Sequence, residues 1–128
     1  MSKSGERRHG ARRSVPAQLS GPTGPEARQL RLCDLSAGGA RCQHFHPLPV
    51  RTRCPLDLPP GLGGVRLQAQ VRWSRVMALQ KVVEGKWLAY YQSGLRFKWL
   101  TPEQRAGLAA ALKILEAAQE SADTAPPA

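Results

Sequence analysis

A strict alternation of apolar and polar residues marks the clearest secondary-structure element of the chain. From Val65 to Trp73, five apolar residues alternate with four polar ones. A period of two places successive side chains on opposite faces of a strand, so this stretch predicts a strand with one buried and one solvated face. The same alternation puts Trp73 on the buried face.

Weaker strand-like patterns lie on both sides of this segment. Loops rich in glycine and proline separate them, as at Ser20–Pro25. Glu84-Gly85 predicts a hairpin between the last two strands. The other expected strands cover residues 15–19, 30–33, 40–43, 52–58, 76–83 and 87–97.

A helix is expected near the C-terminal end of the sequence. Thr101 is followed by Pro102 and, three positions after Thr101, by Gln104, which is typical of a helix start with a capping box. We expect this helix to end near Gln119 and to pack one apolar face on the strands. The residues of that face are Leu108, Ala111, Leu112 and Leu115.

Many short strands followed by one helix predict an all-β domain, a small antiparallel barrel that the helix plugs or flanks. A chain of 128 residues suits one such domain. Residues 1–13 are polar and aperiodic, so we expect a flexible basic arm there. Residues 14–119 are expected to form the barrel and helix, and residues 120–128 a disordered tail.

The formal net charge of +10 limits the kinds of molecule that the protein is expected to bind. It predicts attraction to polyanions, phosphorylated ligands or anionic membrane surfaces. No run of about 18 apolar residues occurs, and no apolar stretch follows the first charges, so neither a membrane span nor a secretory signal is expected. The three cysteines favour reduced thiols over a disulfide framework, and together these features predict a cytoplasmic protein.

Four arginines within seven residues form the first group with candidate binding chemistry: Arg7, Arg8, Arg12 and Arg13. A guanidinium fork matches phosphate oxygens and also the O6/N7 edge of guanine. Arg8 and Arg12 are therefore suited to grip a phosphate and a purine of one small ligand. A solvated basic arm or a nucleic-acid tail is the alternative interpretation.

The second group lies between two expected strands, from Asp34 to Gly39. An ionised Asp34 offers only acceptors, Ser36 can also donate, and Gly38 and Gly39 allow a positive φ or close approach to a ligand. Such residues suit the polar edge of a ring near backbone amides. Alternatively, Asp34 and Ser36 cap a turn that the glycines close.

Taken together, the two groups resemble the motifs of PilZ domains, which are bacterial receptors for cyclic di-GMP. Arg8-x-x-x-Arg12 resembles the RxxxR motif, and Asp34-x-Ser36-x-x-Gly39 resembles the (D/N)xSxxG motif. The similarity extends over residues 6–120. It implies a six-stranded antiparallel β-barrel with one C-terminal helix, which relays a second-messenger signal to a partner protein without catalysis.

The resemblance also implies roles for individual residues. Arg8 and Arg12 would hold phosphate and guanine, and Asp34 and Ser36 would contact a guanine edge. The glycine pair, Gly38 and Gly39, belongs to the same ligand-binding set, and Gly39 would permit close approach. In the family, an arginine directly before RxxxR, here Arg7, accompanies binding of the ligand as an intercalated dimer.

Other functions stay open at this stage. A small basic barrel can bind single-stranded nucleic acid through charge and stacking aromatics, although Trp73 is expected to be buried. A PilZ-like adaptor that works without nucleotide is another alternative. Cys42, His44 and His46 lack the paired spacing of zinc sites, and no set of nucleophile, base and orienting residue is found. We therefore expect surface histidines, no metal or cofactor apart from the ligand cyclic di-GMP, and no enzyme.

Overall fold

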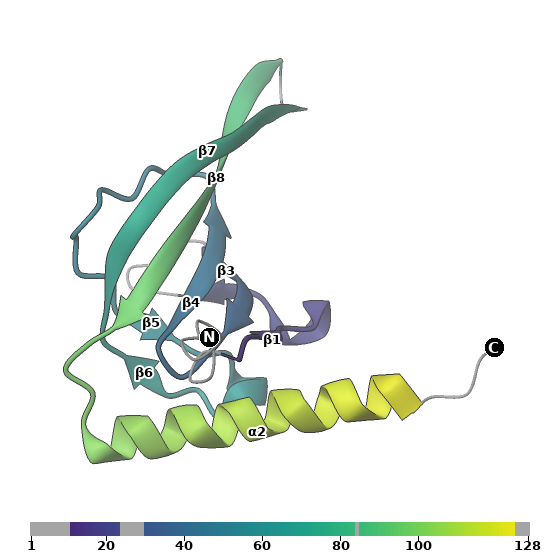
Figure 1. Ribbon diagram of the computed structural model, residues 1–128. Helices are drawn as coiled ribbons and strands as arrows, with labels where there is room; N and C mark the ends of the chain where they lie inside the picture. Colours follow the sequence, from purple (N-terminus) through teal and green to yellow (C-terminus); the bar gives the residue numbers. More distant parts are fainter. Residues whose placement is uncertain (1–10, 24–29, 84, 125–128) are drawn as a thin grey trace, which may run out of the picture.

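The computed structural model describes residues 11–23, 30–83 and 85–124, and its strands lie above one long C-terminal helix (Figure 1). The strands are β1 Arg13–Ser14, β2 Pro22–Thr23, β3 Leu30–Leu35, β4 Gly39–His44, β5 Leu56–Asp57, β6 Arg66–Leu67, β7 Ala69–Val83 and β8 Lys86–Phe97. The helix is α2 Pro102–Thr124, and short 3₁₀ turns occupy Ala17–Leu19 (η2) and Pro60–Leu62 (η4).

Six of the strands form one antiparallel sheet. Its hydrogen-bonded order is β1-β3-β4-β8-β7, with β2 also pairing with β3, while β5 and β6 form a separate pair. Among the described residues this path runs from β1 to β7 without closing on itself. β7 and β8 make a long hairpin that rises beyond β3 and β4 (Figure 1). The sequence predicted an all-β, small antiparallel six-stranded β-barrel with one C-terminal helix; the all-β class, the six antiparallel strands and the C-terminal helix are confirmed.

The core joins both sheets to the helix. Leu35 of β3, Leu56 of β5, Leu67 of β6 and Leu115 of α2 are each 0% exposed. Full burial of one leucine contributes about 1.5–3 kcal/mol to folding. The predicted apolar face of the helix is confirmed, because its residues line this core: Leu108, Ala111 and Leu115 are buried, and Leu112 packs against them.

The helix begins as its sequence predicts. The Thr101 N–H donates to Gln104 Oε1 (2.9 Å), and the Gln104 N–H donates to Thr101 Oγ1 (3.1 Å), which is a capping box. Gln104 Nε2 also donates to the Arg66 carbonyl (2.8 Å) and so ties the first turn to β6. The helix continues to Thr124, so residues 120–124, expected in the tail, are helical. No helix in the described part of the chain is long and apolar enough to cross a membrane.

The expected strand at residues 15–19 is wrong. Proline has no N–H to donate to a strand ladder, and the Pro16 carbonyl accepts from the Leu19 N–H (2.9 Å), which closes the turn of η2. The strand lies earlier, at Arg13–Ser14, where Arg13 pairs with Leu35. Arg13 therefore belongs to the sheet and not to the arm.

Three further strand boundaries differ from those expected. The strand expected from Val65 to Trp73 is divided at Gln68 into β6 and the start of β7, which belong to different sheets. The strand over residues 52–58 shrinks to the two residues of β5, since Pro55 interrupts it, and Arg53 forms only an isolated bridge with Gln70. The expected break between Trp73 and Val76 is absent. β7 runs on to Val83 because it stays paired with β8 through local shifts in register.

His44 is buried on β4, contrary to the expectation that the histidines lie at the surface. It is 2% exposed and stacks on Tyr91 with ring centroids 5.7 Å apart. Its Nε2 lies 2.7 Å from the Ser93 hydroxyl, and its Nδ1 faces the carbonyl oxygen of His46. Burial lowers the pKa of His44 below its ordinary value of 6.5. The neutral ring is therefore part of the folded structure.

The burial of His44 predicts that the free energy of unfolding decreases in mild acid. Below pH 6.5 the unfolded chain takes up a proton at His44 that the folded chain does not, so the free energy of unfolding decreases with falling pH. The slope is at most about 1.4 kcal/mol per pH unit, the limit for one proton, and it ends where the folded group also titrates. Urea unfolding between pH 7 and 5 measures it. His44→Gln should remove this component and the exposed His46→Gln should keep it; an unchanged slope in His44→Gln would contradict the assignment.

Candidate functional site

A tight turn built on Ser36 joins β3 to β4. The Ser36 N–H donates to the Gly39 carbonyl (2.8 Å), and Ser36 Oγ accepts from the amides of Gly38 (3.3 Å) and Gly39 (3.2 Å). Ser36 is buried, so its hydroxyl makes these contacts away from solvent. The interpretation of Ser36 as a turn cap is therefore confirmed.

Gly39 is required by the packing of β4 on β8. A Cβ at this position would lie 2.0 Å from the Leu95 carbonyl oxygen, a backbone atom of the neighbouring strand. Neither Gly39 nor Gly38 has a positive φ, so of the two expected uses of the pair only close approach remains. Space around Gly38 is open, with no atom within 4 Å of a built Cβ. Close approach of a ligand at Gly39 stays a prediction.

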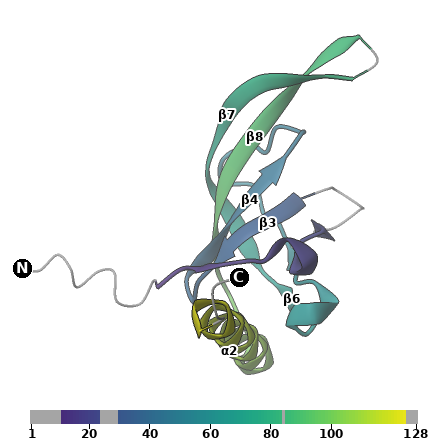
Figure 2. The ribbon, with the colours of Figure 1, turned by 90° about the vertical axis from the view of Figure 1, so that its right-hand side faces the viewer.

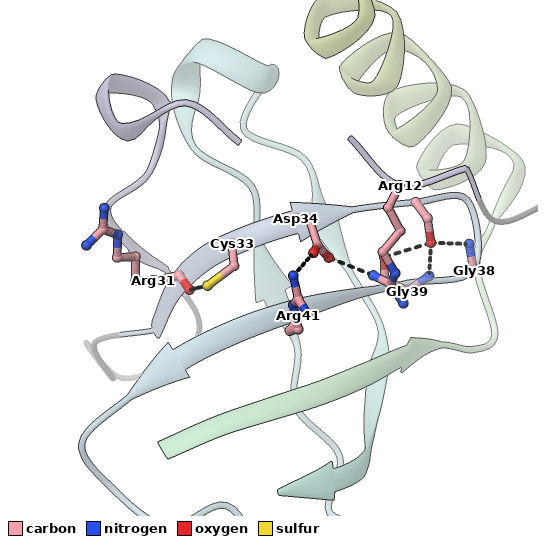
Figure 3. Close-up of polar contacts among 8 residues, drawn as sticks. Arg12, Arg31, Cys33, Asp34, Gly38, Gly39 and Arg41 are labelled. Atoms are coloured by element: carbon pink, nitrogen blue, oxygen red, sulfur yellow. Dashed lines mark hydrogen bonds and ion pairs between the residues drawn. The ribbon is translucent and has the colours of Figure 1, made fainter. Parts of the chain in front are cut away.

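Asp34 lies at the centre of an ionic cluster and not in a turn. Its side chain is only 6% exposed; Oδ1 accepts from Arg12 Nη1 at 2.8 Å, and Oδ2 pairs with Arg41 Nη2 at 2.6 Å (Figure 3). The two guanidinium groups are about half exposed. A carboxylate has roughly four lone-pair sites, so two arginine contacts leave acceptor capacity for a ligand.

The sheet itself brings Arg12 to Asp34. β1 pairs with β3 through Arg13↔Leu35 and Ser14↔Asp34, so the residue just before β1 reaches the carboxylate. Figure 2 shows β1, in purple, beside β3, its partner in the sheet. Arg7 and Arg8, the other arginines predicted for the site, lie outside the described residues.

Arg41 is a site residue that the sequence analysis missed. It stands opposite Asp34 in the β3–β4 ladder. The signal was present, because a hairpin turning between Leu35 and Ala40 places positions 34 and 41 across from each other. Working out that register from the motif would have identified the pair.

Trp73 is the second site residue that the sequence analysis missed. The prediction that its side chain lies on the buried face of the strand is wrong. A register shift between Val71 and Trp73 turns the indole to the face of Arg41, since both residues are opposite Gly94 in the sheet. A Cβ on Gly94 would lie 2.3 Å from Trp73 Nε1, so the ring rests over this glycine. The Arg75 guanidinium lies 4.6 Å from the ring centroid. A flat aromatic surface and the Asp34 acceptor therefore occupy one cross-strand row.

The described residues contain no group of three His, Cys, Asp or Glu side chains placed to hold a metal ion. Burial raises the pKa of the Cys33 thiol, and burial raises that of Cys42 more strongly. Both thiols are therefore protonated at neutral pH and are poor nucleophiles. What the site offers is an anionic acceptor, guanidinium donors and an aromatic surface.

A sequence model of the PilZ domain matches residues 6–113 of the chain. This chain belongs to the PilZ domain family. The match spans both the arginine motif and the Asp34-x-Ser36-x-x-Gly39 motif. No curated protein sequence matches the chain.

Solved structures share the PilZ fold at low sequence identity. The PilZ domain of YcgR from Escherichia coli, solved with c-di-GMP, superposes with a TM-score of 0.68 at 21% identity, covering 93% of this chain and 99% of that one. MrkH, a c-di-GMP-dependent transcription regulatory factor, gives 0.65 at 18%, covering 87% and 52%. The K. pneumonia MrkH complex with c-di-GMP gives 0.61 at 18%, covering 89% and 55%. This chain thus spans about half of MrkH.

Proposed function

We propose that this PilZ domain is a cyclic di-GMP receptor that relays the signal to a partner protein without catalysis, in the cytoplasm. The observation that carries the proposal is the nearly buried Asp34 carboxylate held between Arg12 and Arg41. Guanine presents N1 and N2 donors on one edge, and an acceptor with free lone pairs beside phosphate-binding guanidinium groups is complementary to a guanine nucleotide.

Each residue of the proposed site has a different role in ligand binding. Asp34 accepts from the guanine edge, and Arg41 fixes the orientation of its carboxylate. Arg12 uses one of its five donors on Asp34 and keeps the others for a phosphate or for the O6/N7 edge. Trp73 provides a stacking surface for a base, in the same row of the sheet.

The turn and the arm complete the proposed site. Ser36 holds the β3–β4 turn and can exchange one of its contacts for the ligand, while the amide of Gly38 and the backbone of Gly39 line the approach. Arg8 is proposed to hold phosphate and guanine together with Arg12. Arg7 is proposed to favour an intercalated dimer of the ligand.

Titration calorimetry at two salt concentrations tests this function. We expect the chain to bind cyclic di-GMP more tightly than GTP or a short single-stranded oligonucleotide. A polymer binder with six to ten phosphate contacts loses about 10³- to 10⁵-fold in affinity between 50 and 200 mM salt, because it releases condensed counterions. A compact dinucleotide has no layer of condensed counterions to release, so the affinity for cyclic di-GMP should fall far less over this range of salt.

The result also separates the alternatives. Tight oligonucleotide binding at physiological salt, without binding of cyclic di-GMP, would replace the receptor by a nucleic-acid-binding barrel. Binding of neither ligand would leave a PilZ adaptor that works through protein contacts alone. Either outcome would overturn the proposal.

A further inference from the structure

A basic groove lies at the start of β7. It contains no residue of the Asp34 cluster, although its Arg96 stands opposite Gly39 in the β4–β8 ladder. It encloses about 330 Å³. Its basic residues come from four parts of the chain: Arg51 from the loop before β5, Arg72 from β7, Arg96 from β8 and Lys98 from the segment after β8. Val50 also lines the groove. We call this set the basic groove.

Among the described residues, the charges of the basic groove have no counter-charge within ion-pair distance. In the described parts of the chain, the ion pairs involve Arg12, Arg13, Arg41 and Arg66, and none involves a groove residue. Like charges brought together repel each other, and an external anion relieves that repulsion. A concave surface whose described lining has four cations and no carboxylate is therefore suited to phosphate groups.

Backbone strain points to the same place. Arg51 (φ 76°) and Trp99 (φ 56°) are the two non-glycine residues with positive φ in the described chain. Cβ crowding disfavours this region for such side chains, which glycine would occupy freely. Arg51 lines the groove and Trp99 directly follows Lys98. Strained residues of this kind concentrate at ligand-binding sites, so the coincidence favours a function for both side chains.

Exposed apolar groups adjoin these cations. Trp99 is 57% exposed and Val50 is 52% exposed. The Arg53 guanidinium lies 4.6 Å and the Lys98 ammonium 5.3 Å from the Trp99 ring centroid. An exposed indole among lysine and arginine side chains matches the chemistry of a membrane interface, where tryptophan lies at headgroup level and basic residues meet anionic lipids.

We propose that the basic groove docks the domain on an anionic phospholipid surface. Lipid phosphates would enter the groove between Arg51, Arg72 and Lys98, while Trp99 and Val50 lie among the headgroups. The proposal goes beyond the cyclic di-GMP site, because the groove contains neither Asp34 nor any residue of either PilZ motif. It needs no nucleotide.

Sedimentation of the full chain with vesicles tests the docking site. We expect binding to vesicles of phosphatidylcholine mixed with phosphatidylglycerol and little binding to phosphatidylcholine alone. Each basic residue at an anionic surface is worth about a fivefold change in partitioning, so the double variant Arg51→Gly/Lys98→Gln should bind about 30-fold more weakly. Glycine at position 51 also removes the positive-φ strain, so this variant should fold. The control Arg105→Gln/Lys113→Gln loses the same charge from α2 and should bind like the parent.

Two further measurements sharpen the result. Anionic vesicles should shift the tryptophan fluorescence of the parent to shorter wavelength, and Trp99→Phe should abolish that shift. The groove variant should keep its affinity for cyclic di-GMP, so the outcome is independent of the receptor function.

Three results would overturn the proposal. The first is that the parent protein does not bind anionic vesicles. The second is that the control variant loses as much vesicle binding as the groove variant. The third concerns a single-stranded oligonucleotide at the same ionic strength. If it bound the parent protein more tightly than the vesicles do, and the groove variant lost this binding, the groove would be a nucleic-acid site.

Discussion

Replacing Asp34 by alanine is expected to weaken cyclic di-GMP binding by about 10- to 150-fold, because one hydrogen bond to a charged group is worth roughly 1.5–3 kcal/mol. The carboxylate is the acceptor at the centre of the site, and its two neighbours Arg12 and Arg41 would lose their shared anion. Both guanidinium groups are about half exposed and can be solvated, so the fold should survive. Calorimetry measures the loss in affinity, and thermal unfolding checks the fold.

The base identity of the ligand makes this test specific. Guanine offers two donors to Asp34, whereas adenine presents a donor and an acceptor, so Asp34→Ala should weaken cyclic di-GMP more than cyclic di-AMP. The control is Asp57→Ala, because Asp57 is also paired with an arginine, Arg66, but lies in the β5–β6 pair. Equal losses for both dinucleotides would remove Asp34 from base recognition, and equal losses in the two variants would make the effect structural.

Sequence reasoning succeeded where the determining interactions are local. The capping box of Thr101 and Gln104 joins residues three positions apart, and the bend at Ser36 joins residues within one turn. The apolar face of α2 follows from helical periodicity alone. These features do not depend on how the strands are paired.

The errors arise where pairing between distant strands decides the outcome. A single register shift after Val71 moves Trp73 from the predicted buried face to the face of Arg41, because the side-chain period of a strand is two. Arg41 was missed because its role depends on standing opposite Asp34. The identity of a residue as tryptophan or arginine does not show that it lies beside Asp34, whereas the register of the sheet does.

The position of Gly39 shows the same dependence. Its place in the motif suggested contact with a ligand, and the structure adds a second constraint, the backbone of β8. The β4–β8 pairing that creates this constraint joins Gly39 to Arg96, far apart in the sequence. A motif glycine can thus be required by the fold before any ligand binds.

This constraint gives the largest expected effect on stability. Gly39→Ala would place a Cβ 2.0 Å from the Leu95 carbonyl oxygen, and because this is backbone, relief requires β4 and β8 to separate. Overpacking typically costs 1–3 kcal/mol, and a clash with backbone should cost about 3 kcal/mol or more, a large fraction of the roughly 5–15 kcal/mol that stabilises a domain. Urea unfolding followed by circular dichroism measures the change.

Its neighbour supplies the matched control. Gly38 has open space around a built Cβ and no positive φ, so Gly38→Ala should be about 0.4–1 kcal/mol more stable than the parent, because alanine restricts the unfolded chain. If Gly39→Ala were as stable as Gly38→Ala, the close β4–β8 contact would not exist in solution. If Gly39→Ala were folded and stable but had lost cyclic di-GMP, the glycine would be needed for the ligand alone. Loss of stability without ligand is the outcome expected from the packing of Gly39 on Leu95.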